Sequence, residues 1–340
     1  MKKHVNIPIF IPHLGCPNQC VFCNQRHISG VKAFDPNSVI PTIEEALETI
    51  SDDTEVEIAF FGGSFTGIDR DLMIRLLEIA NSYIQNGRVS EIRCSTRPDY
   101  ITDEILTILG EYGVKTIELG LQTSSDSVLQ MSKRGHSFAD EVNACRMIVD
   151  RGFSLVGQMM IGLPGATPES EVETAEFIVS SGAVGARIYP TVVFRDTELC
   201  SMTESSEYHP LSIEEAISRT VEPLMKFIEA GIEVIRIGLC ASDNLSDAST
   251  YHSGPNHPAL GELIMSRIYY RRAEKMLRNS CCEGRVAIIY IPVGSLSKAI
   301  GQKKENKLRL IREFGLADVK FVQSDELAQY ELKLAFEGDT

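Results

Sequence analysis

The stretch HLGCPNQCVFC, residues 13–23, contains three cysteines spaced C-x3-C-x2-C: Cys16, Cys20 and Cys23. Three thiolates alone do not complete a tetrahedral structural zinc site. They can bind three corners of a four-iron cluster and leave the fourth iron open to another ligand. Phe22 adds an aromatic ring on which a flat cofactor ring can rest. The spacing therefore predicts an iron–sulfur cluster with one open iron.

Other uses of this triplet stay open at this point. A zinc ion whose coordination is completed by His13 or His27 would also have suitable ligands. Cysteine is among the most buried residue types, so three of them can simply pack in a core. A disulfide framework is disfavoured, because nine cysteines is an odd number and the chain shows no signal peptide.

The bulk composition describes a globular protein. A chain of 340 residues with 43% hydrophobic residues suffices for one large domain and a smaller one. No apolar run approaches the length of a membrane span, and the run VAIIYI at 286–291 is typical of a buried strand. We therefore expect a cytoplasmic protein without a membrane partner, in which thiols stay reduced.

Short β-rich runs alternate with amphipathic stretches, which predicts parallel strands joined by right-handed crossovers. Thr102 and Ser137 are expected to cap two of the helices. The fold class expected is α/β, a partial (β/α)6-type TIM-like barrel with a small α+β C-terminal domain. The expected strands are 5–11, 56–61, 91–96, 114–121, 154–161, 185–193, with 232–239 as a further unit; the expected helices are 41–51, 70–86, 102–112, 137–151, 168–181, 212–230, 259–278 and 303–314.

Three parts of the chain are expected from these patterns. Residues 1–240 form the partial barrel, and 241–258 form a Ser/Asp/Asn/Gly-rich loop or linker. Residues 259–340 form a C-terminal α+β accessory region with strands at 285–291, 318–323 and 329–335.

The informative loops follow the predicted strands of the barrel. Cys16 follows the first strand, Gly62 and Gly63 follow the second, and Gln122 follows the fourth. Since the carboxyl ends of parallel strands meet on one rim, these residues are expected to share one site.

Over about residues 5–240 the chain resembles the radical S-adenosylmethionine (SAM) superfamily. The family motif C-x3-C-x-Φ-C corresponds to Cys16, Cys20, Phe22 and Cys23, and its glycine pair to FFGGS at 60–64, with Ser64 where relatives often have Glu. The resemblance implies a [4Fe-4S] cluster on the three cysteines. It also implies reductive cleavage of SAM to methionine and a 5′-deoxyadenosyl radical that abstracts a substrate hydrogen, with an electron donor such as flavodoxin or ferredoxin.

The resemblance also implies a set of residues that position SAM, while no catalytic residue is assigned. Glycines permit close backbone approach to the methionine amino group. A guanidinium fork at Arg134 suits the SAM carboxylate. The implied cofactor-binding residues are Phe22, Gly62, Gly63, Ser64, Gln122, Arg134, Gln158 and Tyr189.

Three further stretches look like the Elongator catalytic-subunit branch of this superfamily. They are ELGLQTSSDSVL at 118–129 with KRGHS at 133–137, GFSLVGQMMIGLPGATPES at 152–170 and ARIYPTVVFRDTEL at 186–199. The first also resembles the coproporphyrinogen dehydrogenase branch. The Elongator subunit has a wider first cysteine gap and an additional acetyltransferase domain, so acetyl-group chemistry is not expected here.

The C-terminal run Ile300–Asn306 resembles a KH-type RNA-binding loop, I-G-x-x-G-x-N, within an element at about 284–336. Lys304 stands where the second glycine is usual. The segment 267–313 carries a net charge of +8 (twelve Lys/Arg against four Glu), whereas the whole chain carries −14. An anionic partner is therefore compatible with this region. The RNA-binding residues implied are Gly301, Lys303, Lys304 and Lys307.

Three hypotheses about function follow. The first is a radical SAM enzyme that modifies RNA, with tRNA as the favoured class. The second is a radical SAM oxidoreductase acting on a small molecule, with His252, Asn256 and His257 near the substrate. The third is a non-enzymatic metal- or cluster-binding protein associated with RNA.

Overall fold

A computed structural model of the chain describes residues 4–12, 14–16, 20–25, 27, 33–51, 53–239, 247 and 249–338. Its contacts form two compact units, the larger comprising Met1–Ser212 and Lys226–Asn256, the smaller Ile213–Met225 and His257–Thr340. We propose the division expected from the sequence, 1–240, 241–258 and 259–340, as the domain organisation. Much of that linker, residues 241–246 and 248, lies outside the described residues.

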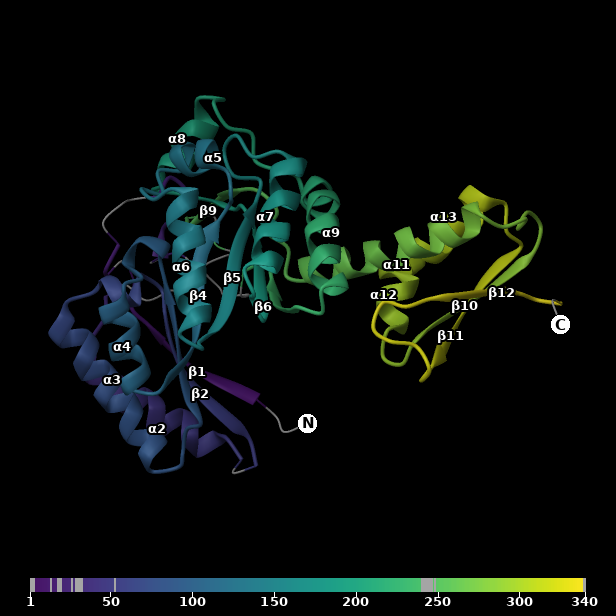
Figure 1. Ribbon diagram of the computed structural model, residues 1–340. Helices are drawn as coiled ribbons and strands as arrows, with labels where there is room; N and C mark the ends of the chain where they lie inside the picture. The colour runs from purple at the N-terminus through teal and green to yellow at the C-terminus, as the bar shows by residue number, and fades with distance from the viewer. Residues whose placement is uncertain are drawn as a thin grey trace. The chain divides into compact units, whose positions relative to one another are not determined.

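The larger unit is built on a parallel sheet of seven strands in the order β1-β2-β3-β4-β5-β6-β8 (Figure 1). Each strand is followed by a crossover to its parallel neighbour, and the sheet curls into a partial barrel, which confirms the expected fold class. The strands are β1 (His4–Phe10), β2 (Glu55–Phe61), β3 (Glu91–Thr96), β4 (Val114–Gln122), β5 (Ser154–Ile161), β6 (Gly185–Pro190) and β8 (Glu233–Ile237).

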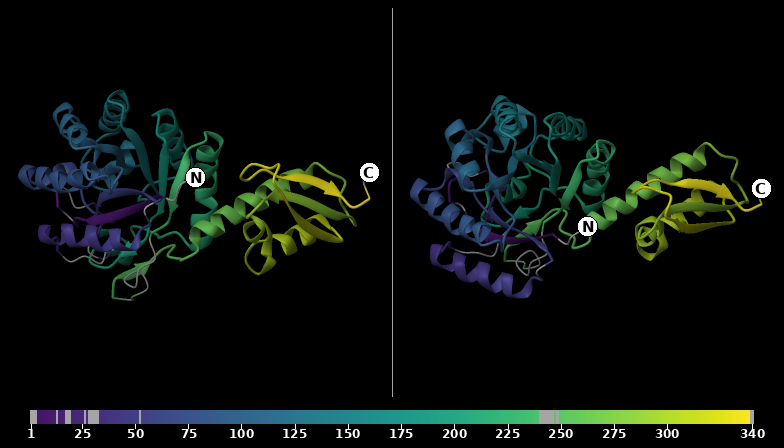
Figure 2. Two further views of the ribbon diagram at one scale, coloured as in Figure 1. Left: turned by 90° about the horizontal axis from the view of Figure 1, so that it is seen from below. Right: turned by 60° about the horizontal axis from the view of Figure 1, so that its bottom comes forward.

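Helices cover the outer face of this sheet (Figure 2). The Thr102 hydroxyl accepts a hydrogen bond from the Ile105 N–H at 3.2 Å, and Ser137 forms a capping box with Asp140, so both expected caps are confirmed. The long helices lie within two residues of their predicted limits. The helices of the larger unit are α2 (Val39–Thr49), α3 (Arg70–Gln85), α4 (Asp103–Glu111), α5 (Asp126–Met131), α6 (Phe138–Asp150), α7 (Pro168–Ser180) and α8 (Glu198–Glu204), with 3-10 turns η1 (Pro36–Ser38), η2 (Phe65–Gly67) and η3 (Pro98–Tyr100); α9 (Ile213–Glu229) is shared between the units.

The predicted single strand 185–193 is wrong beyond Pro190. Strand β6 ends at this proline, and the next two-residue strand, β7 (Val193–Phe194), pairs antiparallel with β9 (Tyr251–Ser253) instead of continuing in the main sheet. The partner strand β9 lies in the stretch for which the sequence predicted only a loop. The pairing depends on a contact between segments far apart in the chain, which local patterns do not reveal.

A layer of buried ion pairs crosses one face of the sheet. Arg93 on β3 donates through Nε to Glu57 on β2 and through Nη1 to Glu118 on β4, both at 2.9 Å. Arg187 on β6 donates to the other oxygen of Glu118 at 2.7 Å. All four residues are at most 9% exposed. The hydrogen bond with Glu57, and then burial, raise the pKa of Glu91 to about 7.

The smaller unit contains a three-stranded sheet in the order β11-β10-β12, with β10 and β11 parallel and β12 antiparallel to β10. Two short helices and a turn connect β10 to β11, as in the expected α+β region. Its elements are α11 (Leu260–Arg278), β10 (Val286–Pro292), α12 (Leu296–Ile300), η4 (Gln302–Lys304), α13 (Glu305–Phe314), β11 (Asp318–Ser324) and β12 (Lys333–Phe336). Among the described residues, no helix has the length and apolarity that a membrane span requires.

The turn before α13 holds Lys304 in the left-handed backbone region, with φ 64° and ψ 26°. That conformation costs a residue with a Cβ roughly 1–2 kcal/mol, and glycine adopts it freely. Lys304→Gly is therefore expected to stabilise the start of α13 by about 1 kcal/mol, measured as slower amide hydrogen exchange in α13 of the full chain. Lys304→Ala removes the same charge but keeps a Cβ, so its exchange should stay near wild type. Faster exchange in the glycine variant would contradict this strain argument.

Candidate functional site

The three cysteines lie in the loop after β1, at the carboxyl end of the sheet. Among the described residues of this loop, Cys20 is buried, whereas Cys16 and Cys23 are partly exposed. The loop turns tightly between the second and third cysteine, where the Cys23 N–H donates to the Cys20 carbonyl at 3.0 Å. Pro17, Asn18 and Gln19 lie outside the described residues.

The thiols share one electrostatic environment. Burial raises the pKa of Cys16 most, and the neighbouring Cys20 raises it further. Burial, with Cys20 and Cys16, raises the pKa of Cys23 to about 12. Three thiolates in one short loop repel one another, so they ionise together only beside a positively charged group such as an iron cluster.

Two side chains donate to these sulfurs. The Arg134 Nη1 lies 3.2 Å from the Cys20 Sγ, and the Gln25 Nε2 lies 3.6 Å from the Cys23 Sγ. Of the two histidines that could complete a zinc site, His27 stacks on Phe194 and lies 3.4 Å from an Asp196 oxygen. His13 lies outside the described residues.

The glycine pair after β2 lies against the cysteine loop. A Cβ on Gly63 would lie 2.3 Å from the Leu14 carbonyl oxygen, and one on Gly62 would lie 3.1 Å from the Ile11 nitrogen. The structure therefore requires small residues here so that two backbone segments can pack. The expected contact of these glycines and Ser64 with SAM stays a prediction; Ser64 is buried, with its hydroxyl 3.5 Å from that of Thr96.

Gln122 ends β4 in an irregular conformation. The register between β4 and β5 shifts between Gly120 and Gln122, and Gln122 has φ 75°, in the left-handed region. A bulge of this kind turns a side chain out of the regular alternation. The Gln122 Oε1 accepts from the Gln158 Nε2 at 3.4 Å, and the Arg134 Nη2 donates to the Gly120 carbonyl. Gln122, Gln158 and Arg134, expected from separate motifs, thus lie at one place.

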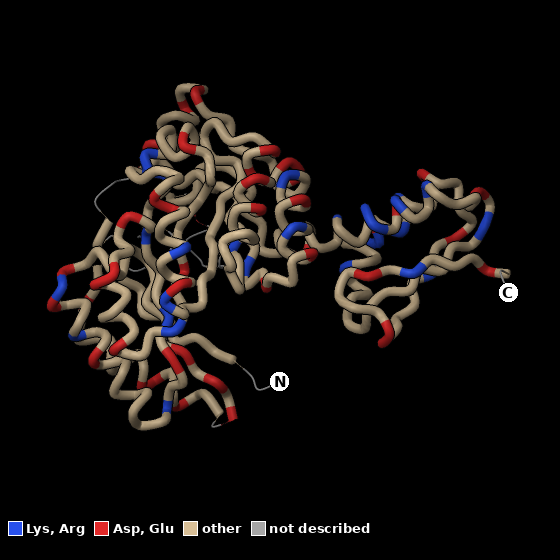
Figure 3. The backbone as a smooth tube through the Cα atoms, viewed as in Figure 1, with Lys and Arg blue, Asp and Glu red and all other residues tan. Residues whose placement is uncertain are grey.

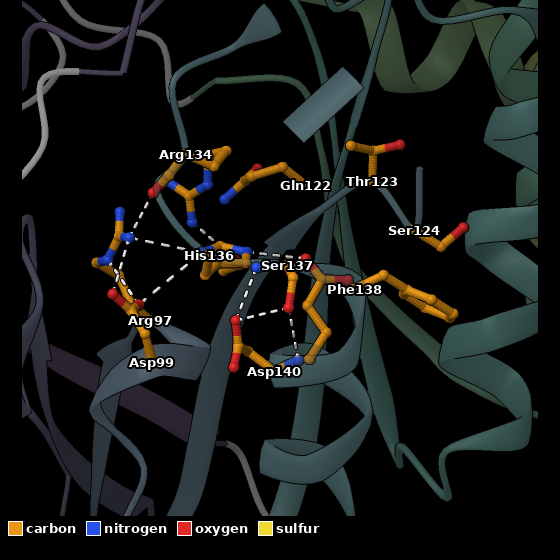
Figure 4. A network of polar contacts seen from close by, with 12 residues as sticks. Arg97, Asp99, Gln122, Thr123, Ser124, Arg134, His136, Ser137, Phe138 and Asp140 are labelled. Carbon is orange, nitrogen blue, oxygen red and sulfur yellow. Dashed lines mark hydrogen bonds and ion pairs between the residues drawn. The ribbon is translucent and has the colours of Figure 1, made fainter. Parts of the chain in front are cut away.

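A network that the sequence did not predict lies beside this place (Figure 4). Arg97, which follows β3, binds both Asp99 oxygens, through Nε at 2.9 Å and Nη2 at 3.0 Å. Its Nη2 also donates to the Arg134 carbonyl and lies 3.5 Å from the His136 Nδ1. The sequence could have indicated Arg97 as a site residue, because Arg97 follows a strand on the same rim as the predicted residues.

His136 has a structural place in this network. Its Nε2 lies 2.9 Å from an oxygen of Glu141 on α6, and both side chains are fully buried. Burial, with the charges of Arg134 and Arg97, lowers the pKa of His136 to about 3. Burial also raises the pKa of Glu141. His136 is therefore neutral at physiological pH, in keeping with the absence of an assigned chemical role in the sequence analysis.

The two predicted aromatic residues have packing partners. Phe22 packs against a buried cluster that joins the cysteine loop to α8, formed by Val21, Val193, Leu199, Cys200 and Tyr208. Tyr189 on β6 is partly buried and lies close enough to Arg187 that the two interact. Their expected contacts with SAM stay predictions.

The KH-like residues belong to the smaller unit. Gly301 has φ 81°, and a Cβ there would lie 3.0 Å from the Asn306 nitrogen, so this glycine is required. Lys303 and Lys304 are exposed in the turn, and neither forms an ion pair with another described residue. Lys307 instead pairs with Asp318 at 2.9 Å. Figure 3 shows Lys and Arg along α11, but three of its arginines pair with acidic residues: Arg267 with Glu214, Arg271 with Glu222 and Arg278 with Glu274.

The donor set around the triplet fits a cluster and a small cofactor that carries a carboxylate. The three thiols lie close enough to interact electrostatically, and one guanidinium already donates to a sulfur. The Arg97 Nη1 is buried and has no hydrogen-bond partner among the described residues, which leaves a charged donor for a further anionic group.

Comparisons with known proteins place this site in a family. The model of the radical SAM superfamily matches residues 10–178, and that of the radical SAM C-terminal domain matches residues 183–270. The tRNA uridine(34) acetyltransferase of Methanocaldococcus jannaschii is 30% identical over 205 residues, covering 54% of this chain and 38% of that protein. Human Elongator complex protein 3 is 27% identical over 234 residues, covering 63% of this chain and 42% of that protein.

A further relative and one solved structure extend the match. An uncharacterized protein of M. jannaschii is 30% identical, covering 64% of this chain and 70% of its own length. The structure of the archaeal Elp3 of Methanocaldococcus infernus, with an N-terminal deletion, has a TM-score of 0.61 and 21% identity, covering 81% of this chain and 64% of that one, so the two share a fold. The chain belongs to the radical SAM superfamily, whose enzymes use a [4Fe-4S] cluster and SAM.

Proposed function

We propose that Cys16, Cys20 and Cys23 hold the [4Fe-4S] cluster of a radical SAM enzyme that modifies RNA, with tRNA as the substrate class. The observation that carries the first part is that the three cysteines interact electrostatically in one loop and that the Arg134 guanidinium donates to the Cys20 sulfur. When bound, the cluster and SAM supply a 5′-deoxyadenosyl radical. The residues of this chain bind and orient the two cofactors and exclude water from them.

The residues around the triplet have complementary parts in this proposal. Gln122 at the end of β4 and Gln158 within β5 present amide groups suited to hydrogen bonds with ribose hydroxyls. Gly62, Gly63 and Ser64 offer backbone groups to the amino end of SAM. Phe22 and Tyr189 provide ring faces for the adenine side. The packing of Gly63 against Leu14 supports this arrangement, because it holds the β2 rim against the cysteine loop.

The test of the cofactor proposal is SAM cleavage by the purified chain. The protein is reconstituted anaerobically with iron and sulfide, reduced with dithionite and incubated with SAM. We expect 5′-deoxyadenosine and methionine as products. A preparation with about four irons per chain that yields neither product would overturn the proposal.

The RNA part of the proposal has two supports. Two relatives are named tRNA uridine(34) acetyltransferase, and the chain spans 38% and 52% of their lengths. The smaller unit joins β10 and the parallel β11 through two helices, with the Ile300–Lys304 turn between the helices. This turn presents the exposed Lys303 and Lys304 beside backbone that can approach a phosphate.

Charge reversal at this turn is expected to weaken tRNA binding. In Lys303→Glu/Lys304→Glu, the slope of log affinity against log salt concentration should fall by about 2, since two phosphate contacts are lost. Gel shifts with unfractionated tRNA over a range of salt concentrations measure this slope. Lys275→Glu/Lys333→Glu makes the same charge change at exposed positions of the same unit and should leave the slope near wild type. Equal losses in both variants would point to net charge alone and contradict a binding turn.

A small-molecule substrate is the second candidate, and one observation favours it. Ion pairs with Glu and Asp engage several basic residues of the segment 267–313, so less of its charge is available to a polyanion than the sequence suggests. Wild-type protein that cleaves SAM but shows no tRNA binding at low salt would favour this candidate.

A further inference from the structure

Arg97 is a buried guanidinium with one end engaged and the other end open. The residue is 4% exposed. Its Nε and Nη2 grip the two Asp99 oxygens, and Nη2 also donates to the Arg134 carbonyl. These bonds fix the plane of the guanidinium, because a two-point pair with a carboxylate permits one orientation.

The open end is Nη1, which carries two N–H groups. It is buried and has no hydrogen-bond partner among the described residues. In Figure 4 this nitrogen points away from Asp99, beside Arg134. A buried charged donor without an acceptor is unfavourable, so such a group in a folded protein calls for a ligand, an ion or a water.

Arg97 is connected to the cluster cysteines through Arg134. Its Nη2 donates to the Arg134 carbonyl, and the Arg134 Nη1 donates to the Cys20 sulfur at 3.2 Å. The open Nη1 therefore belongs to the region where SAM must meet the cluster.

Arg134, which the family resemblance implied for the SAM carboxylate, forms a hydrogen bond through each of its two terminal nitrogens. Its Nη1 donates to the Cys20 sulfur at 3.2 Å, and its Nη2 donates to the Gly120 carbonyl. A guanidinium so placed acts on a cluster ligand and on the backbone of the β4 bulge. The two arginines thus present different ends to the site.

We propose that the Arg97 Nη1 donates to the carboxylate of SAM, with Asp99 as the positioning residue that fixes its orientation. Arg134 then acts on the cluster through Cys20. This inference rests on the proposed function, because it requires SAM at the three cysteines. It names a residue outside the set that the family resemblance implied.

The experiment compares SAM with decarboxylated SAM, which keeps the adenosine, sulfonium and amine but lacks the carboxylate. Both are titrated anaerobically into cluster-loaded, oxidised protein, so that binding is measured without cleavage. In Arg97→Met, the ratio of SAM affinity to analogue affinity is expected to fall by about 10- to 100-fold, and analogue affinity should barely change. Arg151→Met removes an exposed arginine of the same unit and should leave the ratio at the wild-type value.

Two other variants separate binding from a purely structural role. Arg97→Lys keeps the positive charge but lacks the forked guanidinium, so the ratio of SAM affinity to analogue affinity should fall by a smaller factor. If Arg97→Met fails to load the cluster, the result for Arg97→Lys tests the inference instead. Arg134→Met should instead make the reduction potential of the SAM-free cluster more negative, because a donor to a cluster ligand is removed.

Each outcome bears on a distinct claim. Equal weakening of SAM and its analogue in the Arg97 variants, with an unchanged ratio, would overturn the inference while leaving the proposed function intact. Failure of cluster-loaded wild type to bind SAM at all would overturn the proposed function and, with it, this inference.

Discussion

Cys20→Ser is expected to lose the iron–sulfur cluster and all SAM cleavage. The cluster needs one thiolate for each of three irons, and only two thiolates remain. A serine hydroxyl cannot replace the third, because it is not ionised near neutral pH. Cys20 is the most buried of the three, and its sulfur accepts a hydrogen bond from Arg134. Iron and sulfide analysis after anaerobic reconstitution, with chromatography for 5′-deoxyadenosine, measures the effect. Cys16→Ser and Cys23→Ser should behave in the same way.

The matched control is Cys281→Ser, an exposed cysteine of the smaller unit. It should keep the wild-type iron content of about four per chain and the wild-type rate. A Cys20→Ser protein with full iron and undiminished 5′-deoxyadenosine formation would show that the triplet is not the cluster site. Loss of iron in the Cys281 variant would indicate a second cluster-dependent region.

Arg93→Met is expected to lower the free energy of unfolding by about 3–5 kcal/mol, since it removes the shared partner of two buried carboxylates. Arg93 lies 2.9 Å from oxygens of both Glu57 and Glu118, which are 2% exposed or less. Glu118 keeps the bonds from Arg187, whereas Glu57 keeps only His4 at 3.1 Å and Glu91. Urea unfolding of the full chain, followed by circular dichroism, gives the measurement.

The loss should be smaller at low pH. Burial raises the pKa of Glu57, but hydrogen bonds with Glu91 and Arg93 outweigh it and lower the pKa below its ordinary value. The stability that a lowered carboxyl pKa provides is present above pH 4.5 and disappears as the pH falls through the folded-state value. In the variant Glu57 can take a proton instead, so the difference from wild type should shrink between pH 7 and pH 4.

Two comparisons sharpen this prediction. Arg93→Met/Glu57→Gln removes the unpaired charge together with its partner and should recover part of the lost stability. Arg151→Met, at an exposed ion pair with Asp103, should cost less than about 1 kcal/mol. A stability loss in Arg93→Met that is equally small, or that grows at low pH, would contradict a structural role for the layer of buried ion pairs.

Most of the barrel could be predicted from local pattern. Strands β3 and β5 have the limits that their apolar runs predicted, and α7 ends one residue early. These elements are amphipathic over several turns or consist of continuous apolar residues, so burial of their own side chains decides their conformation. The prediction failed at Val193–Phe194, because those residues pair with Tyr251–Ser253, more than fifty positions away.

The cofactor site divides in the same way. The positions of the triplet, the glycine pair and Gln122 could be predicted because each belongs to a short motif at the end of a strand, and Arg134 because it belongs to the motif KRGHS. The layer around Arg93 could not, since its partners come from other strands. The Arg97–Asp99 and His136–Glu141 pairs are only two and five positions apart, but no motif marked them.

By itself, the sequence determined the superfamily, the three cysteines and the alternation that makes the sheet parallel. The spacing of neighbouring residues carries that information. Only the tertiary structure showed that Arg134 donates to Cys20 and Gly120, and that the Arg97 Nη1 is buried without a hydrogen-bond partner among the described residues. The physical reason is that a side chain's hydrogen bonds depend on the atoms that folding brings within about 3 Å, and most of these come from distant parts of the chain.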